Sequence, residues 1–298
     1  MVSLSKMYEV TPFRESFVTE GSLELRSKFS EDGYLFLKGA IDPSLCNSLL
    51  KKMITLMKGE LEMPKGSWSP LLVGDPFVET DKTWDRIYPK LQSLEAFHQF
   101  FHTSNVLNLM RRILNADPFV YPMKMARIAT PRKSGFETPP HQDAYSHHAG
   151  PTMAGIWVAL HDVDETMGRL AILDRSHLKG VREVVHSPGV GGVQCKIFND
   201  EKLWHVSNVE CGDIILFSSQ TVHRAEPNTS EHRVRMTGEH ALEHLLMQEV
   251  IEGTQPKEKI RQAKMASDNE QFADMILGNP RTLLVDFGMS LALLVSFI

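Results

Sequence analysis

The segment HQDAYSHH, residues 141–148, contains three histidines and one aspartate. Two neutral imidazoles and one carboxylate on one face of Fe(II) leave its other coordination positions open for reactants. In an extended segment, residues i and i+2 point to the same side, so His141 and Asp143 can bind one ion while Gln142 points away. The pattern His-x-Asp is too short to be specific by itself. A metal site therefore also needs a third ligand from another part of the chain.

The best candidate for the third ligand is His223, in the segment GDIILFSSQTVHRAEPNTSEHRVRMT, residues 212–237. It comes just after a buried strand, a position at which a β-core presents a ligand at its mouth. Farther along, Arg233, Arg235 and Thr237 alternate and are expected to share one face of a strand. A guanidinium with a hydroxyl two residues later can hold a carboxylate. We expect Arg235 to bind a carboxylate, and the pattern leaves Arg233 as the alternative.

The elements that must position these residues change in character along the chain. Residues 29–41 predict a strand, Asp42 is a good N-cap with Pro43 at the first helical position, and residues 103–115 predict a second amphipathic helix. From about residue 118 to 240, short apolar or alternating segments are separated by turn residues, which is typical of an antiparallel sandwich or barrel. We therefore predict a mainly β fold with flanking helices. The expected organisation is a single domain over residues 1–298, with a β-core at about 118–240, N-terminal helices at about 42–115 and C-terminal helices at about 241–298.

The composition of the 298 residues argues against several classes of function. A net charge of -5 and the lack of a long basic run speak against a nucleic-acid or anionic-membrane partner. The cysteines Cys46, Cys195 and Cys211 are far apart, which fits neither a disulfide framework nor a thiolate zinc site and favours a reducing, cytoplasmic location. The N-terminus has no apolar core of signal-peptide length. The apolar segment at residues 283–298 is shorter than the roughly 20 residues that span a bilayer, so we expect a docked tail, with a membrane-surface tail as the alternative.

Three segments together resemble a known family. HQDAYSHHAGPTMAGIWVALHDVDETMGRLAILDRSH (residues 141–177), the segment at 212–237 and EDGYLFLKGAIDPSLCNSLL (residues 31–50) are similar to the phytanoyl-CoA dioxygenase family of iron(II)/2-oxoglutarate oxygenases. The likeness covers roughly residues 28–240. It implies a double-stranded β-helix of the jelly-roll or cupin-like type, in which two facing antiparallel sheets carry the metal ligands.

The resemblance also implies roles for single residues. It implies His141, Asp143 and His223 as iron ligands, Arg235 and Thr237 as binding the far carboxylate of the cosubstrate 2-oxoglutarate, and Trp157 as an aromatic neighbour of that cosubstrate. The implied reaction uses Fe(II), 2-oxoglutarate and O2, releases succinate and CO2, and oxidises a C–H bond of a small molecule, most often by hydroxylation. Desaturation, epoxidation and rearrangement follow from the same chemistry and stay open.

Two turns depart from the family pattern. Met167-Gly168 replaces the usual Asn-Gly, and residues 174–177 read Asp-Arg-Ser-His where the family has Pro-Gly-Ser-His. Both changes concern turn chemistry, so the expected fold is unaffected, but the family's contacts in this stretch are not carried over. Asp143 is retained, whereas the related halogenases have a small residue at that position. A halogenase is therefore not expected.

The substrate is the least determined part of the prediction. The segment at residues 60–100 combines Trp68, Trp84 and Tyr88 with charged residues and is expected to form a lid. Its aromatic rings suggest a small apolar substrate such as a natural product or a lipid-like molecule. The sequence leaves the oligomeric state open, a homodimer included.

Other residues have open roles. Lys124 and Arg127 could reach into the pocket or face water, and His147 and His148 are expected in a loop near the mouth of the site. The segment HALEH at 240–244 matches a zinc-protease signature, which requires both histidines on a helix. It directly follows the expected cosubstrate strand, which argues against that class. A second alternative keeps the fold without catalysis, as a cupin-like protein that binds a metal or a small molecule.

Overall fold

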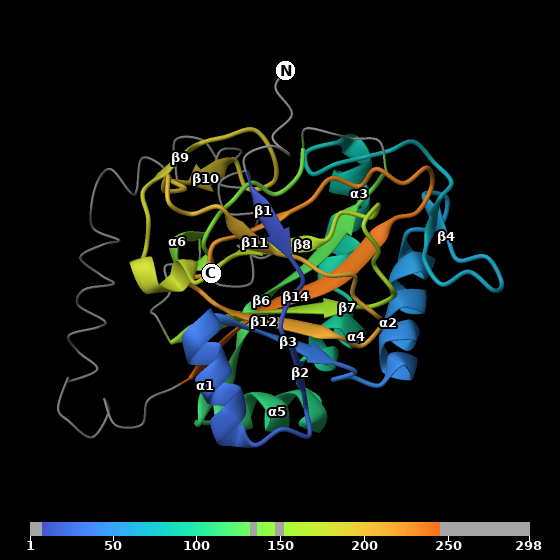
Figure 1. Ribbon diagram of the computed structural model, residues 1–298. Coiled ribbons are helices and arrows are strands. Elements are labelled where there is room, and N and C mark those ends of the chain that lie inside the picture. Colours follow the sequence, from blue (N-terminus) through green and yellow to red (C-terminus); the bar gives the residue numbers. More distant parts are fainter. Residues whose placement is uncertain (1–7, 132–135, 147–151, 245–298) are drawn as a thin grey trace, which may run out of the picture. The chain divides into compact units, whose positions relative to one another are not determined.

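Two facing β-sheets form the centre of the computed structural model, which describes residues 8–131, 136–146 and 152–244 (Figure 1). The larger sheet contains, in spatial order, β2 (Glu15–Phe17), β3 (Tyr34–Lys38), β12 (Ile214–Ser218), β7 (Met153–Ala159), β14 (Arg235–His244) and β6 (Pro118–Ala129). The smaller sheet contains β1 (Glu9–Thr11), β11 (Leu203–His205), β8 (Leu170–Leu173) and β13 (His223–Ala225). Two short antiparallel pairs lie apart from these sheets: β4 (Leu61–Glu62) with β5 (Leu71–Leu72), and β9 (Val184–His186) with β10 (Val193–Cys195).

The chain passes repeatedly from one sheet to the other. It runs from β7 in the larger sheet to β8 in the smaller one, and later from β12 to β13 and back to β14. Within the larger sheet, β7 pairs antiparallel with both β12 and β14. This alternation confirms the predicted mainly β fold with a double-stranded β-helix core.

The inner faces of the two sheets meet in an apolar cluster. It consists of Phe13, Tyr34, Phe36, Trp157, Ala159, Val163, Met167, Leu170, Ile172, Val209, Ile215 and Phe217. Every residue of β7 is buried, because this strand packs against the cluster on one face and against the helices on the other. Its near-continuous apolar sequence, rather than strict alternation, follows from that position.

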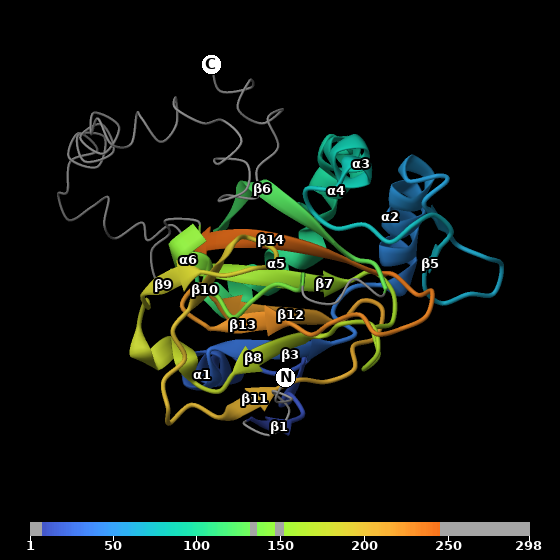
Figure 2. The ribbon, with the colours of Figure 1, turned by 90° about the horizontal axis from the view of Figure 1, so that it is seen from above.

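The helices cover the outer face of the larger sheet (Figure 2). They are α1 (Ser22–Asp32), α2 (Pro43–Leu56), α3 (Lys82–Gln92), α4 (Glu95–Phe100) and α5 (Ser104–Leu114). The predicted start of α2 is confirmed, because the side chain of Asp42 accepts a hydrogen bond from the backbone N–H of Ser44 at 2.8 Å and Pro43 is the first helical residue. The second predicted helix corresponds to α5.

The predicted return to helix after residue 240 is wrong for the residues that the structure describes there. β14 continues to His244, with Leu242 paired to Ala154 of β7 and Val120 of β6. Neighbours on both sides satisfy the backbone of this segment, so its pattern belongs to a buried strand. The rest of the predicted C-terminal helices and the apolar tail, residues 245–298, lie outside the described residues. The described part up to His244 belongs to one compact unit, and a single domain over the whole chain stays a prediction.

Two further properties bear on the sequence-based expectations. None of the described helices is both long enough and apolar enough to cross a membrane. Cys46, Cys195 and Cys211 are all free thiols.

Candidate metal centre and cosubstrate pocket

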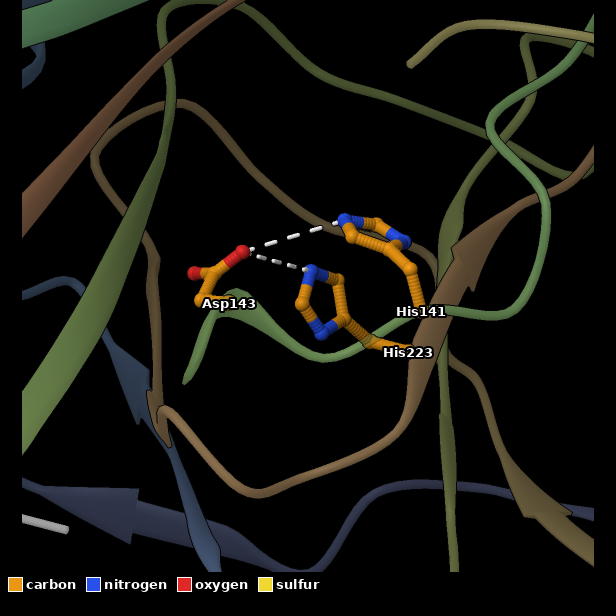
Figure 3. Close-up of side chains that lie close together, drawn as sticks. All are labelled: His141, Asp143 and His223. Atoms are coloured by element: carbon orange, nitrogen blue, oxygen red, sulfur yellow. Dashed lines mark ion pairs between the residues drawn. The ribbon is translucent and has the colours of Figure 1, made fainter. Parts of the chain in front are cut away.

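His141, Asp143 and His223 converge on one point between the sheets (Figure 3). One potential ligand atom from each of them lies within 4.8 Å of the other two. Nε2 of His141 and Nε2 of His223 lie 3.8 and 3.7 Å from Oδ1 of Asp143. These separations leave room for an ion that each ligand atom approaches to about 2 Å. The structure thus brings together the three residues that were predicted as ligands.

Hydrogen bonds fix the tautomers of both imidazoles. Nδ1 of His141 lies 2.9 Å from the carbonyl oxygen of Pro139, and Nδ1 of His223 lies 3.0 Å from that of Thr221. A carbonyl oxygen only accepts, so each Nδ1 carries the hydrogen and donates it, and each Nε2 keeps its lone pair on the side of Asp143. Burial, and then the neighbouring His223, lower the pKa of His141 to about 4. The ring is neutral at pH 7, which is the form that binds a metal.

Backbone pairing and a glycine place these side chains. His141 and His223 form an isolated antiparallel bridge in which the N–H of each donates to the carbonyl of the other at 3.0 Å. His223 comes after β12, as predicted, and begins β13. Asp143, in contrast, is the first residue of the short helix α6 (Asp143–Ser146) and does not continue an extended segment. Gly155 makes space for its carboxylate, because a Cβ there would lie 2.9 Å from Oδ2 of Asp143 and 2.5 Å from the ring of Phe217.

Arg235 lies in the same hollow as the two histidines. It is 6% exposed, and its Nη1 donates to the carbonyl oxygen of Gly168. Its Nε has no hydrogen-bond partner among the described residues, and neither does the hydroxyl of the buried Thr237, the next residue on that face of β14. Burial lowers the pKa of Arg235 to about 10, so the guanidinium is still charged at pH 7. A buried cation with an unsatisfied hydroxyl two residues later on the same strand face fits a carboxylate ligand, although Thr237 itself does not line the hollow.

Arg233 is directed elsewhere. Its Nη1 donates to Asp164 Oδ2 at 2.5 Å and its Nη2 to Thr166 Oγ1 at 2.6 Å, while its guanidinium lies 4.8 Å from the ring centre of Trp68. Arg233 lies two residues before β14, which begins at Arg235. The expected alternation of side chains along one strand therefore covers Arg235 and Thr237 but not Arg233. Of the two candidate arginines, the structure places Arg235 in the hollow.

A histidine that sequence reasoning did not single out holds the backbone next to Arg235. His161 is 1% exposed, and its Nε2 accepts a hydrogen bond from the N–H of Met236 at 2.9 Å. Its Nδ1 donates to the carbonyl oxygen of Asp162 at 2.7 Å. Burial lowers the pKa of His161 to about 4, so it is neutral at pH 7. In the sequence, His161 and Asp162 form no recognisable motif, so the contact of His161 with the backbone of β14 could not be predicted.

The hollow measures about 280 Å³, its open mouth included. Trp157, Leu170 and Ala225 form its apolar walls. Trp157 is 1% exposed and stands in register with Glu239 of β14. The structure therefore places Trp157 in the same hollow as Arg235, and its contact with the cosubstrate stays a prediction.

An ion pair between the half-buried Arg127 and the buried Glu239 forms another part of the wall. Nε and Nη2 of Arg127 donate to the two carboxylate oxygens of Glu239 at 2.7 and 3.0 Å. Although burial opposes the charged form, Arg127 lowers the pKa of Glu239 to about 2, so the pair is ionised at pH 7. Arg127 therefore reaches into the pocket, whereas Lys124 pairs in register with His240 and is buried at 4% exposure. Glu239 is a pocket residue that sequence reasoning missed, although its alternation with Arg235 could have revealed it.

The remaining candidates lie away from this hollow. Trp84 stacks on Tyr88 with ring centres 4.2 Å apart, and Trp68 is 45% exposed beneath Arg233. None of these rings lines the pocket, so they do not indicate what it binds. The zinc-protease alternative is wrong, because residues 240–244 belong to a strand and not to a helix. His147 and His148 lie outside the described residues.

A double-stranded β-helix with a cluster of two imidazoles and one carboxylate, and with a buried arginine in the hollow that both imidazoles line, is the arrangement of iron(II)/2-oxoglutarate oxygenases. The donor set suits Fe(II), and the unsatisfied Arg235 and Thr237 suit the far carboxylate of 2-oxoglutarate. The family model of phytanoyl-CoA dioxygenase (PhyH) matches residues 29–237. The chain belongs to the phytanoyl-CoA dioxygenase family, and it is an enzyme whose cofactors are Fe(II), 2-oxoglutarate and O2.

Individual relatives agree with this membership. A 1-deoxypentalenic acid 11-beta-hydroxylase of Streptomyces exfoliatus is 24% identical over 219 residues, which cover 70% of this chain and 75% of the relative. A phytanoyl-CoA dioxygenase domain-containing protein 1 of Danio rerio is 26% identical over 249 residues, which cover 68% and 84%. The epimerase SnoN, solved in complex with Fe3+, alpha ketoglutarate and nogalamycin RO, is 17% identical with a TM-score of 0.53 over 75% of this chain and 83% of its own. The last similarity concerns the fold alone.

Proposed function

We propose that this enzyme hydroxylates a C–H bond of a small natural-product or lipid-like molecule and converts 2-oxoglutarate and O2 to succinate and CO2. His141, Asp143 and His223 hold Fe(II), and Arg235 with Thr237 holds the far carboxylate of 2-oxoglutarate. The observation that carries the proposal is the convergence of the three ligand atoms within 4.8 Å, at a hollow that both histidines line and that also contains an incompletely bonded buried guanidinium.

The protein's own residues position the reactants. The bound iron and 2-oxoglutarate supply the oxidising power. Nδ1 of each histidine stays bonded to a carbonyl, which keeps both Nε2 atoms directed at the ion. Arg235 fixes the orientation of the cosubstrate, and Trp157 and Leu170 exclude water from it. The walls of the hollow would hold one C–H bond of the substrate next to the metal ligands and so would select the position that is oxidised.

The walls and the relatives support the proposed substrate class. Trp157, Leu170 and Ala225 offer an apolar surface, and the charges of Arg127 and Glu239 are mutually neutralised. A pocket of this kind favours a substrate that is uncharged near its reacting carbon. The Streptomyces relative is named as a hydroxylase, and a structural neighbour comes from nogalamycin biosynthesis. Both support a role in secondary metabolism.

An intracellular location is part of the proposal. Three free thiols, of which Cys46 and Cys195 are buried, are consistent with a reducing compartment.

The proposal is tested by anaerobic titration of the metal-free enzyme with Fe(II) and then with 2-oxoglutarate. Chelation of Fe(II) by 2-oxoglutarate should produce a weak visible charge-transfer band in the wild type. Asp143→Ala and His223→Ala should lose the band. A wild type that binds iron without developing a band would contradict the proposal and favour a cupin-like binding protein.

A further inference from the structure

The residue between the two proposed ligands of the His-x-Asp motif is Gln142, and it is 2% exposed. Its Nε2 donates to the carbonyl oxygens of Gly180 at 2.9 Å and of Gln220 at 2.5 Å. Its Oε1 accepts from the backbone N–H of Arg182 at 2.8 Å. Both amide hydrogens and the amide oxygen therefore bind main-chain groups of two other segments.

Both segments are connected to the proposed metal ligands. Gln220 lies in the turn that leads from β12 to His223, so one bond of Gln142 joins the first ligand pair to the segment that carries the third ligand. The other two bonds anchor the pair to residues 176–182, which we call the anchor segment.

The anchor segment also holds the other side of the site. The hydroxyl of Ser176, which is fully buried, accepts a hydrogen bond from the N–H of Val222 at 2.8 Å, directly before His223. The anchor segment is itself fixed, because Arg182 donates to both carboxylate oxygens of Glu201 at 2.6 and 2.5 Å inside the protein. Both ligand-bearing parts of the chain are thus hydrogen-bonded to the anchor segment, which the buried residues Ser176 and Arg182 hold in the protein.

We propose that Gln142 is a positioning residue of the metal centre, which sets the distance between the His141–Asp143 pair and His223 through the anchor segment. The proposal rests on the proposed function, because the ligand roles belong to it. A shift or rotation of residues 141–143 would leave buried amide groups without hydrogen-bond partners, which opposes such a movement. Partners that orient metal ligands typically change metal affinity by about 10- to 100-fold when they are replaced.

The test compares Gln142→Met with a matched control. Methionine has a similar length but makes no such hydrogen bonds. The control is Asn228→Leu, because Asn228 is another buried amide that binds the main chain, with Nδ2 2.8 Å from the carbonyl oxygens of both Ala129 and Arg233. Co(II) serves as the probe, since its absorption reports both affinity and ligand geometry. The apoprotein's unfolding midpoint in urea is measured alongside.

Both variants should be less stable, but only Gln142→Met should weaken Co(II) binding by about 10- to 100-fold and change the shape of the Co(II) spectrum. A dissociation constant of Gln142→Met within threefold of the wild type would overturn the proposal, and so would an equal weakening in Asn228→Leu. Ser176→Ala removes one hydrogen bond of the anchor segment and should weaken Co(II) binding by about three- to tenfold. If Gln142→Met does not fold, this variant tests the positioning role in its place.

The same titrations separate this proposal from the one on which it rests. If the wild type binds no Co(II), or if His223→Ala binds it as the wild type does, the proposed metal centre itself is wrong. If the wild type and His223→Ala behave as expected and Gln142→Met is unaffected, only the positioning role fails.

Discussion

Replacement of Arg235 by methionine should remove most of the binding of 2-oxoglutarate while metal binding is retained. Arg235 is 6% exposed, and its Nε has no partner among the described residues. Loss of one member of a buried, hydrogen-bonded charge pair costs about 2–5 kcal/mol. At about 1.4 kcal/mol per factor of ten, the dissociation constant of 2-oxoglutarate should rise by roughly 30- to 4,000-fold. The lower half of this range is expected, because water can enter the open hollow and solvate the carboxylate.

The assay is the anaerobic 2-oxoglutarate titration of the Fe(II)-loaded enzyme, followed by its charge-transfer band. Arg233→Met is the matched control, because Arg233 bonds to Asp164 and Thr166 outside the hollow. This control should change the dissociation constant by less than threefold. Arg235→Lys keeps the charge but not the two-pronged geometry, so it should bind with intermediate affinity. The reasoning is refuted if Arg233→Met loses 2-oxoglutarate and Arg235→Met retains it.

Three further predictions concern residues around the site. Gly155→Ala should weaken Co(II) binding by about tenfold or more, because the added Cβ would lie 2.5 Å from the ring of Phe217, which packs on His223, and 2.9 Å from Oδ2 of Asp143. An unchanged Co(II) affinity would show that the ligands do not need this space. The pKa of His161 is about 4 in the folded chain and about 6.5 when unfolded, so its contribution to stability is complete above pH 6.5 and lost as the pH falls towards 4. Between pH 7.5 and 5.5, His161→Gln should therefore lose about 1 kcal/mol less unfolding free energy than the wild type in urea titrations, and equal losses would contradict the assignment. Glu239→Gln should destabilise the protein by about 3 kcal/mol, the lower end of the range for buried pairs, because it removes the counter-charge of Arg127, whose side chain is 20% exposed. The double variant Arg127→Met/Glu239→Leu should recover most of this loss in the same urea assay.

Local patterns of the sequence predicted local structure well. Asp42 followed by Pro43 marked the start of α2, because a cap acts on the residues next to it. The short segments between about 118 and 240 indicated a β-core, and β6 and β7 begin and end close to where their apolar runs do. The segment at 29–41 was only partly a strand, since its first residues complete α1 and the left-handed Gly33 ends that helix.

The outcome at the end of the β-core shows the limit of such patterns. The apolar residues after 240 are compatible with a helix or with a strand that is buried on both faces. Pairing of β14 with β6 and β7 decided for the strand as far as His244. Sheet pairing joins residues that are distant in the sequence, so no local window contains this information.

The sequence by itself determined which residue types are available to the site and their local spacing: the His141–Asp143 pair, a later histidine and an arginine near a hydroxyl. Only the tertiary structure decided that His223 forms a bridge with His141, and that Arg235 rather than Arg233 lies in the hollow. The physical reason is that the alternation along a strand determines which side chains share a face. Which of the two faces points inward depends on the sheet register and on where the strand begins. The hydrogen bonds of Gln142 were also found only in the structure. Its partners are main-chain groups of distant segments, which a sequence motif does not indicate.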